Sequence, residues 1–120
     1  MIRSMSETVT PSLYTYRAHV TAAYDGDSIT CDIDLGFGVI LKKQKIRLLD
    51  INAPEIRGDS REAGLASRDA LRDRILDKQV TLRTKKDRKG KYGRWLGEIW
   101  LDDECINQWM LTEGHAVPYG

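Results

Sequence analysis

The residues best suited to chemistry in this chain are acids, an amide and arginines in three short segments. Asp25 and Asp27 form the first segment, the second runs from Arg47 to Glu55, and the third ends at Arg94. Carboxylate, amide and carbonyl oxygens are the ligands that hard divalent cations such as Ca²⁺ prefer. A guanidinium binds phosphate oxygens in a forked geometry that lysine does not reproduce. Together these groups predict cleavage of a phosphodiester at a hydrated metal ion.

Each residue type indicates a part in that chemistry. The expected metal ligands all offer oxygen atoms, and they are Asp27, Asn52 and the backbone carbonyl of Ala53. Glu55 follows a proline that fixes the turn, so its carboxylate is expected to take a proton from the attacking water. Arg47 and Arg94 would bind the non-bridging phosphate oxygens, where negative charge grows in the transition state.

The elements around these segments must bring them together. Apolar and polar residues alternate over residues 14–22 and 29–35, which is typical of strands with one buried face. The two strands therefore form a predicted hairpin with Asp25 and Asp27 at its tip. Five strands are expected in all, over residues 14–22, 29–35, 39–51, 80–84 and 95–101.

Two helices complete the expected pattern. Asp59 and Glu62 resemble a capping box at the start of a helix that runs to Leu76. The side of this helix that packs on the sheet would hold Ala63, Ala66, Ala70, Leu71 and Ile75. A shorter helix from Ile106 to Glu113 would stop at Gly114 in the left-handed conformation.

This order indicates a mainly β chain with helices, an OB-fold. We expect a five-stranded Greek-key barrel with a helix between strands 3 and 4 and a short C-terminal helix. Loops 1–2 and 4–5 flank the nucleic-acid face of such barrels. Here those loops hold the two acids on one side and residues 85–94 on the other, within a run over residues 83–94 that has seven basic residues against Asp87 alone. That stretch would draw a polyanion to one face, although a solvated loop can have the same composition.

Length and composition bound the rest. One domain over residues 14–120 is expected, preceded by a mobile tail over residues 1–13. No stretch approaches the roughly 20 apolar residues that cross a bilayer, and the polar start lacks a signal-peptide core. We therefore expect a cytoplasmic monomer without a membrane partner, and secretion stays open. Cys31 and Cys105 are interpreted as packing residues.

In order and spacing, these segments resemble the staphylococcal nuclease (thermonuclease) family from about Val20 to Ala116. The resemblance rests on the Asp27 hairpin, the interval from Arg47 to Glu55, and Lys91-Tyr92-Gly93-Arg94. Asn107 and Gly114 also fall where the late helix of the family has these residue types. It implies an OB-fold endo- or exonuclease that hydrolyses single-stranded or denatured DNA and RNA with Ca²⁺. Such enzymes cut at the 5′-oxygen and leave 3′-phosphates.

The resemblance also implies roles for individual residues. Asp27 and position 52 would bind the metal, Glu55 would be the general base, and Arg47 and Arg94 would bind phosphate. The other implied site residues are Asp25 behind the metal ligands, Lys91 and Tyr92 near a terminal phosphate, and Tyr119, near a family tyrosine that stacks on the base.

One departure bears on the metal. The family usually has aspartate where this chain has Asn52, so metal affinity is expected to fall. Asp50 could approach the same ion, or it could pair with a nearby basic side chain.

The alternative to a nuclease is a non-catalytic OB-fold module that binds nucleic acid or a protein. Such a module has little use for Glu55, Arg47 and Arg94 together, so these three residues favour the enzyme. Asn52 is the feature that favours the binding module.

Overall fold

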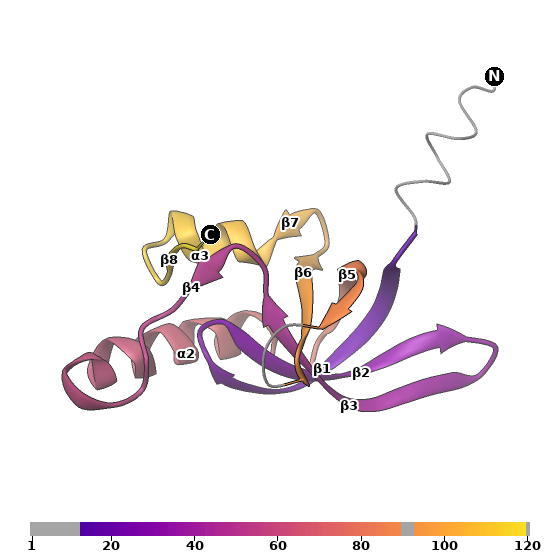
Figure 1. Cartoon of the computed structure of the whole chain (residues 1–120), viewed down its shortest axis with the longest axis horizontal. Helices are drawn as coiled ribbons and strands as arrows, with labels where there is room; N and C mark the ends of the chain where they lie inside the picture. Colours follow the sequence, from indigo (N-terminus) through magenta and orange to yellow (C-terminus); the bar gives the residue numbers. More distant parts are fainter. Residues whose placement is uncertain (1–12, 90–92, 120) are drawn as a thin grey trace, which may run out of the picture.

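The fold is a closed barrel of five long strands (Figure 1). The computed structural model describes residues 13–89 and 93–119, with the backbone alone for residues 86–89. The barrel strands are β1 (Thr15–Asp25), β2 (Ser28–Gly36), β3 (Val39–Leu48), β5 (Gln79–Lys89) and β6 (Trp95–Leu101). Antiparallel pairs join them in the order β3-β2-β1-β5-β6, and a parallel pairing of β3 with β6 closes the ring. The expected five-stranded OB-fold is therefore confirmed.

Shorter elements cover this barrel. They are β4 (Ile51–Asn52), the 3-10 turn η1 (Gly58–Ser60), α2 (Arg61–Ile75), β7 (Glu104–Cys105), α3 (Ile106–Thr112) and β8 (Val117–Pro118). The helix α2 packs against β1, and α3 packs against β6 and β4. In Figure 1, α2 lies to the left of the barrel at the height of β1, β2 and β3, and α3, β4 and β8 lie above α2. None of the described helices has both the length and the apolar character needed to cross a membrane.

Apolar side chains fill the barrel and the spaces beneath the helices. The largest fully buried ones include Ile29, Ile46, Leu48, Leu82 and Ile99 from strands, and Leu71, Ile75, Ile106 and Met110 from helices. Burying one such side chain stabilises the fold by about 1.5–3 kcal/mol. Cys31 belongs to this core, in line with a packing role, while Cys105 is half-buried outside it, and both thiols are free.

The strands depart from the expected periodicity where the backbone bulges. A register shift in β1 between Val20 and Ala22 moves the next buried position to Ala23. The third strand ends at Leu48, earlier than expected, because the chain turns at Asp50, whose φ is 65°. It resumes as the short β4, which pairs with β8. The fourth barrel strand, by contrast, is longer than the expected 80–84.

The main helix also differs from its expectation at the start and on its buried side. The capping box is wrong, because Asp59 lies in η1 and the N-cap is Ser60, without a side-chain cap. The buried residues are Gly64, Ser67, Leu71 and Ile75, while Ala63 and Ala66 are exposed. A Cβ on Gly64 would lie 2.6 Å from the carbonyl oxygen of Glu55. The helix therefore presents Gly64 to the loop at Glu55, because the two backbones nearly touch there.

The second helix agrees closely with its expectation. It ends at Thr112, one residue before the expected end, and Gly114 adopts the left-handed conformation with φ 78°. The N–H groups of His115 and Ala116 both donate to the Met110 carbonyl, at 2.9 and 3.1 Å. This stop sends the chain back toward β4.

Candidate active site

The tip of the β1–β2 hairpin holds a carboxylate in a fixed position. Asp27 is buried, and its Oδ2 accepts a hydrogen bond from the Ala53 N–H at 2.8 Å. Gly26 permits this tight placement, because a Cβ there would lie 2.7 Å from the Ala53 Cβ. Asp25 Oδ1 accepts from the Asp27 N–H at 3.2 Å and so braces the turn. The tip is therefore packed beneath the segment that follows β4.

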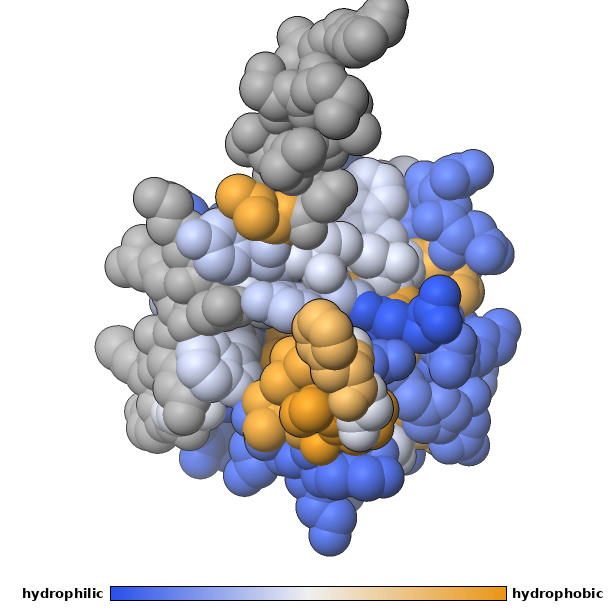
Figure 2. Space-filling view, turned by 90° about the vertical axis from the view of Figure 1, so that its right-hand side faces the viewer, coloured by the Kyte–Doolittle hydropathy of each residue, from blue (hydrophilic) through white to orange (hydrophobic). Residues whose placement is uncertain are grey.

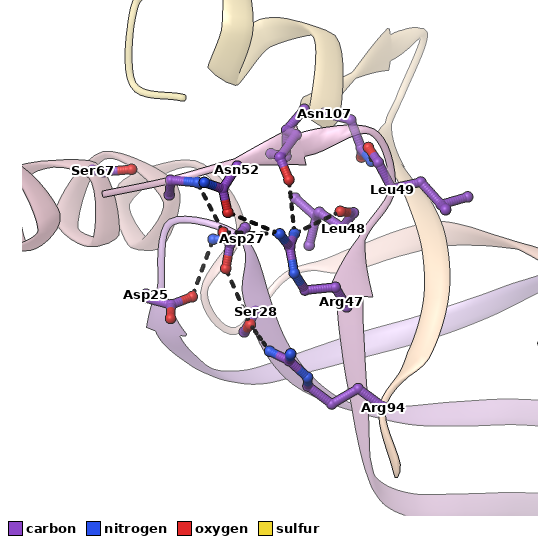
Figure 3. Close-up of polar contacts among 12 residues, drawn as sticks. Asp25, Asp27, Ser28, Arg47, Leu48, Leu49, Asn52, Ser67, Arg94 and Asn107 are labelled. Atoms are coloured by element: carbon purple, nitrogen blue, oxygen red, sulfur yellow. Dashed lines mark hydrogen bonds and ion pairs between the residues drawn. The ribbon is translucent and has the colours of Figure 1, made fainter. Parts of the chain in front are cut away.

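Arg47, at the end of β3, joins that carboxylate to the turn between β3 and β4 (Figure 3). Its Nη1 donates to the carbonyls of Leu48 and Ile51, both at 2.9 Å. Its Nη2 lies 3.2 Å from Asn52 Oδ1 and 3.4 Å from Asp27 Oδ2. One guanidinium thus binds the turn, the amide and the acid at once.

Arg94 reaches the same carboxylate through a serine. Its Nη1 donates to Ser28 Oγ at 2.8 Å, and Ser28 Oγ lies 3.2 Å from Asp27 Oδ1. Figure 3 shows Arg47, at the end of β3, and Arg94, just before β6, on either side of Asp27 and Ser28. Sequence reasoning assigned no role to Ser28. The only signal in the sequence was its place directly after Asp27. In the structure, the strand register sets Ser28 opposite Arg47.

The β4–β8 pairing brings Tyr119 to the cluster from the end of the chain. The Arg47 Cζ lies 5.4 Å from the centroid of the Tyr119 ring, within the range of a cation–π contact. The Tyr119 N–H donates to the Asp50 carbonyl at 2.9 Å, which fixes the backbone. Tyr119 is 61% exposed, so a further flat group has access to it.

A buried amide holds the turn that carries this arrangement. Asn107 Oδ1 accepts from the Ile99 N–H at 3.0 Å, and its Nδ2 donates to the carbonyls of Leu49 and Gly97 at 3.0 and 3.2 Å. These bonds join α3, β6 and the end of β3. The family resemblance singled out Asn107 without giving it a task, and the contacts supply a structural one.

Glu55 lies beside the cluster rather than within it. Its carboxylate pairs with the Arg57 Nε at 2.9 Å, and its side chain is 68% exposed. Its carbonyl accepts from the Ser60 hydroxyl at 2.7 Å, which anchors the loop. Glu55 and Asp25 line the same open hollow of about 330 Å³, together with Tyr24, Ile56 and Arg57. The expected base therefore adjoins the acidic tip without a hydrogen bond to Asp27.

Negative charge is crowded at the hairpin tip. The pKa of Asp25 is raised from 3.8 to about 6, chiefly by burial and also by the hydrogen bond and charge of Asp27. A second carboxylate charge beside Asp27 is therefore disfavoured. In the described part of the chain, no three acidic, histidine or cysteine side chains gather at one point.

Several expected site residues have other placements. Lys91 and Tyr92 lie outside the described residues. The contact of Ala53 with Asp27 is made by its N–H, rather than by the carbonyl expected to bind metal. Asp50 borders a separate hollow that Arg83 and Lys85 also line.

The chain is similar to proteins of known families. A sequence model described as staphylococcal nuclease homologue matches residues 45–120. A thermonuclease from Staphylococcus intermedius is 29% identical over 100 residues, and one from Staphylococcus hyicus is 30% identical over 100 residues. Both alignments cover 81% of this chain and 56% of the relative.

A third relative comes from a different genus. An uncharacterized endonuclease of Haemophilus influenzae is 36% identical over 95 residues, which cover 79% of this chain and 48% of the relative. The chain thus spans about half the length of the curated relatives it matches.

Proposed function

We propose, because the chain belongs to the family of staphylococcal nuclease homologues, that it is a nuclease acting on single-stranded or denatured DNA and RNA. The observation that carries the proposal is the convergence of two arginines on one buried carboxylate. Arg47 contacts Asp27 directly, and Arg94 contacts it through Ser28. Such a cluster has positive charge ready for a phosphodiester and oxygen atoms ready for a cation. Residues 14–120 would form the single active domain, working as a monomer without a membrane partner.

The donor atoms fit a hard divalent ion such as Ca²⁺. Asp27 Oδ2 and Asn52 Oδ1 both lie within 3.4 Å of the same Arg47 nitrogen, so two oxygens already converge on one positively charged atom. Carboxylate and amide oxygens of this kind suit Ca²⁺. Asp27, Asn52 and the Ala53 carbonyl would hold the ion, with Asp25 behind them. When bound, it would supply charge at the scissile phosphate and a site for the attacking water.

The arginines would stabilise the transition state. Arg47 and Arg94 would donate to the non-bridging phosphate oxygens, where charge grows as the nucleophile adds. The phosphate would then compete with Asn52 and Asp27 for the Arg47 guanidinium. The remaining substrate contacts are assigned to Lys91 and Tyr92 at a terminal phosphate and to Tyr119 at a base.

Glu55 would accept the proton of the attacking water. Its present partner is Arg57, and because water screens an ion pair this exposed, the pair exchanges readily. Loss of that proton would let the water oxygen bond to phosphorus while the bond to the 5′-oxygen breaks, and the departing 5′-oxygen would take a proton from solvent to become a hydroxyl. The phosphate would remain on the 3′-oxygen of the other product.

A digestion assay tests the proposal. Purified protein with millimolar Ca²⁺ should degrade denatured DNA, and a chelator should stop it. Glu55→Gln should lower the rate by about 10²–10⁴-fold, the usual contribution of a general base. Arg47→Ala should also remove most activity, whereas Glu113→Gln, an exposed acid at the end of α3, should change little. Activity that survives chelation would remove the metal from the account, and full activity in Arg47→Ala would remove the site.

A non-catalytic binding module is the second candidate. The observation that favours it is the place of Glu55, which pairs with Arg57 at the solvent-exposed edge of the cluster. Asn52 points the same way, because an amide carries less negative charge to the metal than a carboxylate. Such a module would bind oligonucleotides in a salt-sensitive manner and create no new 3′-phosphate ends.

A further inference from the structure

The β2–β3 hairpin extends beyond the barrel as an arm with an apolar tip. In Figure 1 it points away from both helices. The exposed apolar residues of this arm are Leu35, Phe37, Val39, Ile40 and Leu41. Figure 2, which views the molecule from that end, shows apolar surface protruding at the centre with hydrophilic surface below it and to its right. Their exposure rises from 38% at Leu41 to complete exposure at Phe37.

Phe37 is the residue that the fold itself explains least. It is fully exposed at the turn between the two strands. Its φ is 56°, between Gly36 at 82° and Gly38 at 77°. The left-handed region favours glycine or asparagine, and a bulky residue there is strained. An aromatic ring in this place gains nothing from the folded chain, and contact with a bound partner would compensate for the strained backbone.

Basic residues lead from this tip back to the candidate active site. Lys43 and Lys45 are exposed on β3, between the tip and Arg47. Side chains alternate along a strand, and Ile46 and Leu48 face the core, so Lys45 and Arg47 share the outer face. This row is complementary in charge to a chain of phosphates.

A bulge sets the position of the first lysine. The register between β2 and β3 shifts opposite Asp32, where Lys43 has φ 55°. Asp32 Oδ1 accepts from the Lys43 N–H at 2.9 Å, while its Oδ2 pairs with Lys42 at 3.4 Å. Bulges re-aim side chains, and this one is held by a carboxylate. Lys42 is thus paired with Asp32 within the hairpin, and the proposed phosphate contacts are assigned to Lys43 and Lys45.

We propose that this arm is a second binding surface for the polynucleotide, on which the strand leaving Arg47 follows Lys45 and Lys43 and stacks a base on Phe37. The inference rests on the proposed function. The eight residue steps of β2 from Ser28 to Gly36 span roughly 26 Å at about 3.3 Å per residue. That length matches about eight stacked nucleotides at about 3.4 Å each, within the range of OB-fold site sizes. The charged row that continues from Arg47 is what favours a polyanion over another protein surface.

Binding and cleavage should respond differently to the arm. Binding is measured in chelator by the fluorescence anisotropy of a labelled thymidine oligomer of about 16 nucleotides. The dissociation constant of Phe37→Asn should be at least about fivefold higher than that of the unchanged chain, as expected when a stacked base is lost. Phe37→Trp should bind as well as the unchanged chain. In Ca²⁺, Phe37→Asn should lower kcat/KM on the long oligomer but not on one of about four nucleotides, which is too short to span the arm.

Matched controls separate the arm from general effects. Leu13→Ser removes an exposed apolar side chain elsewhere and should leave binding unchanged. Lys43→Ser should reduce the slope of log binding constant against log salt by about 0.7, the value for one single-strand phosphate contact. Lys78→Ser, on the turn between α2 and β5, should not. Phe37→Asn should melt at or above the temperature of the unchanged chain, because asparagine tolerates the left-handed turn.

Other outcomes would overturn the inference. Equal binding of the long oligomer by Phe37→Asn and the unchanged chain would remove the stacking contact. If Phe37→Asn instead abolished a concentration-dependent dimer in sedimentation, the arm would belong to a second copy. If it abolished binding to phosphatidylserine vesicles alone, the arm would belong to a membrane surface. If the oligomer bound in a Phe37-dependent manner and was not cleaved, the binding role of the arm would be supported and the proposed nuclease activity would be refuted.

Discussion

Asn52→Asp tests the candidate metal site through a change of one charge. The amide Oδ1 lies 3.2 Å from the Arg47 Nη2, so the new carboxylate would face the place where two oxygens already converge. Asn52 is exposed, so the screening of water applies, and one pair of unit charges at about 4 Å is worth about 1 kcal/mol. A divalent ion would gain about 2 kcal/mol, against about 1 kcal/mol for the competing Arg47. The net expectation is Ca²⁺ binding about fivefold tighter.

Isothermal calorimetry measures this difference directly. The matched control is Gln108→Glu, which adds the same charge at an exposed position of α3. In chelator, Asn52→Asp should also melt slightly higher, because its hydrogen bond to Arg47 becomes charge-assisted. Unchanged Ca²⁺ affinity in Asn52→Asp would refute the placement of the ion. An equal gain of Ca²⁺ affinity in Gln108→Glu would show that the effect comes from net charge alone.

Three further predictions concern buried residues. Asn107→Ala should lower the free energy of unfolding by about 2–4 kcal/mol in urea titrations, because it leaves buried backbone groups without partners. A loss below about 0.5 kcal/mol would show that the Asn107 side chain does not stabilise the turn. Gly26→Ala should cost about 1–3 kcal/mol and weaken Ca²⁺ binding, since its methyl group would collide with the side chains beneath the hairpin tip; normal stability and affinity together would contradict the tight packing. Burial raises the pKa of the Cys31 thiol from 9.0 to about 12, so in a thiol titration at about pH 8 the half-buried Cys105 should react and Cys31 should react only on unfolding. The pKa of Cys31 is higher in the folded than in the unfolded chain, so its contribution to the free energy of unfolding should be full below pH 9.0. That contribution should fall as the pH rises from 9.0 toward about 12. A free energy of unfolding that rises over this pH range would contradict the prediction.

The barrel was predictable because its signals are local. Alternation identified the strands, turn residues located the hairpin tip, and Gly114 marked the helix stop. The end of β3 was not predictable in this way. The turn after Leu48 depends on Asn107, which is 58 positions from the Leu49 carbonyl that it binds. No pattern along β3 contains that contact.

The packed side of α2 shows the same limit. Apolar periodicity favoured the alanines, yet the helix turns Gly64 and Ser67 inward. The reason is the closeness of the loop at Glu55, where any Cβ at position 64 would collide. Ser67 in turn donates to the His115 carbonyl at 2.7 Å and so ties the helix to the end of the chain. Hydrophobicity alone does not encode such a close approach.

The candidate site was foreseen in its residue types and only partly in its contacts. Order and spacing brought out Asp27, Arg47 and Arg94, and the fold sets them side by side. The bridging role of Ser28 was missed, because a serine after a hairpin tip is commonplace. The pairing of Glu55 with Arg57 was missed as well, since it depends on the course of an irregular loop.

End-group analysis of a digest tests the central claim most directly. Denatured DNA treated with the chain and Ca²⁺ should accumulate 3′-phosphate and 5′-hydroxyl ends, and Arg94→Lys should lose most of this activity because a forked donor is replaced by a point charge. Intact DNA under these conditions, or the same ends at the same rate from Arg94→Lys, would contradict the account of one site built by Asp27, Arg47 and Arg94.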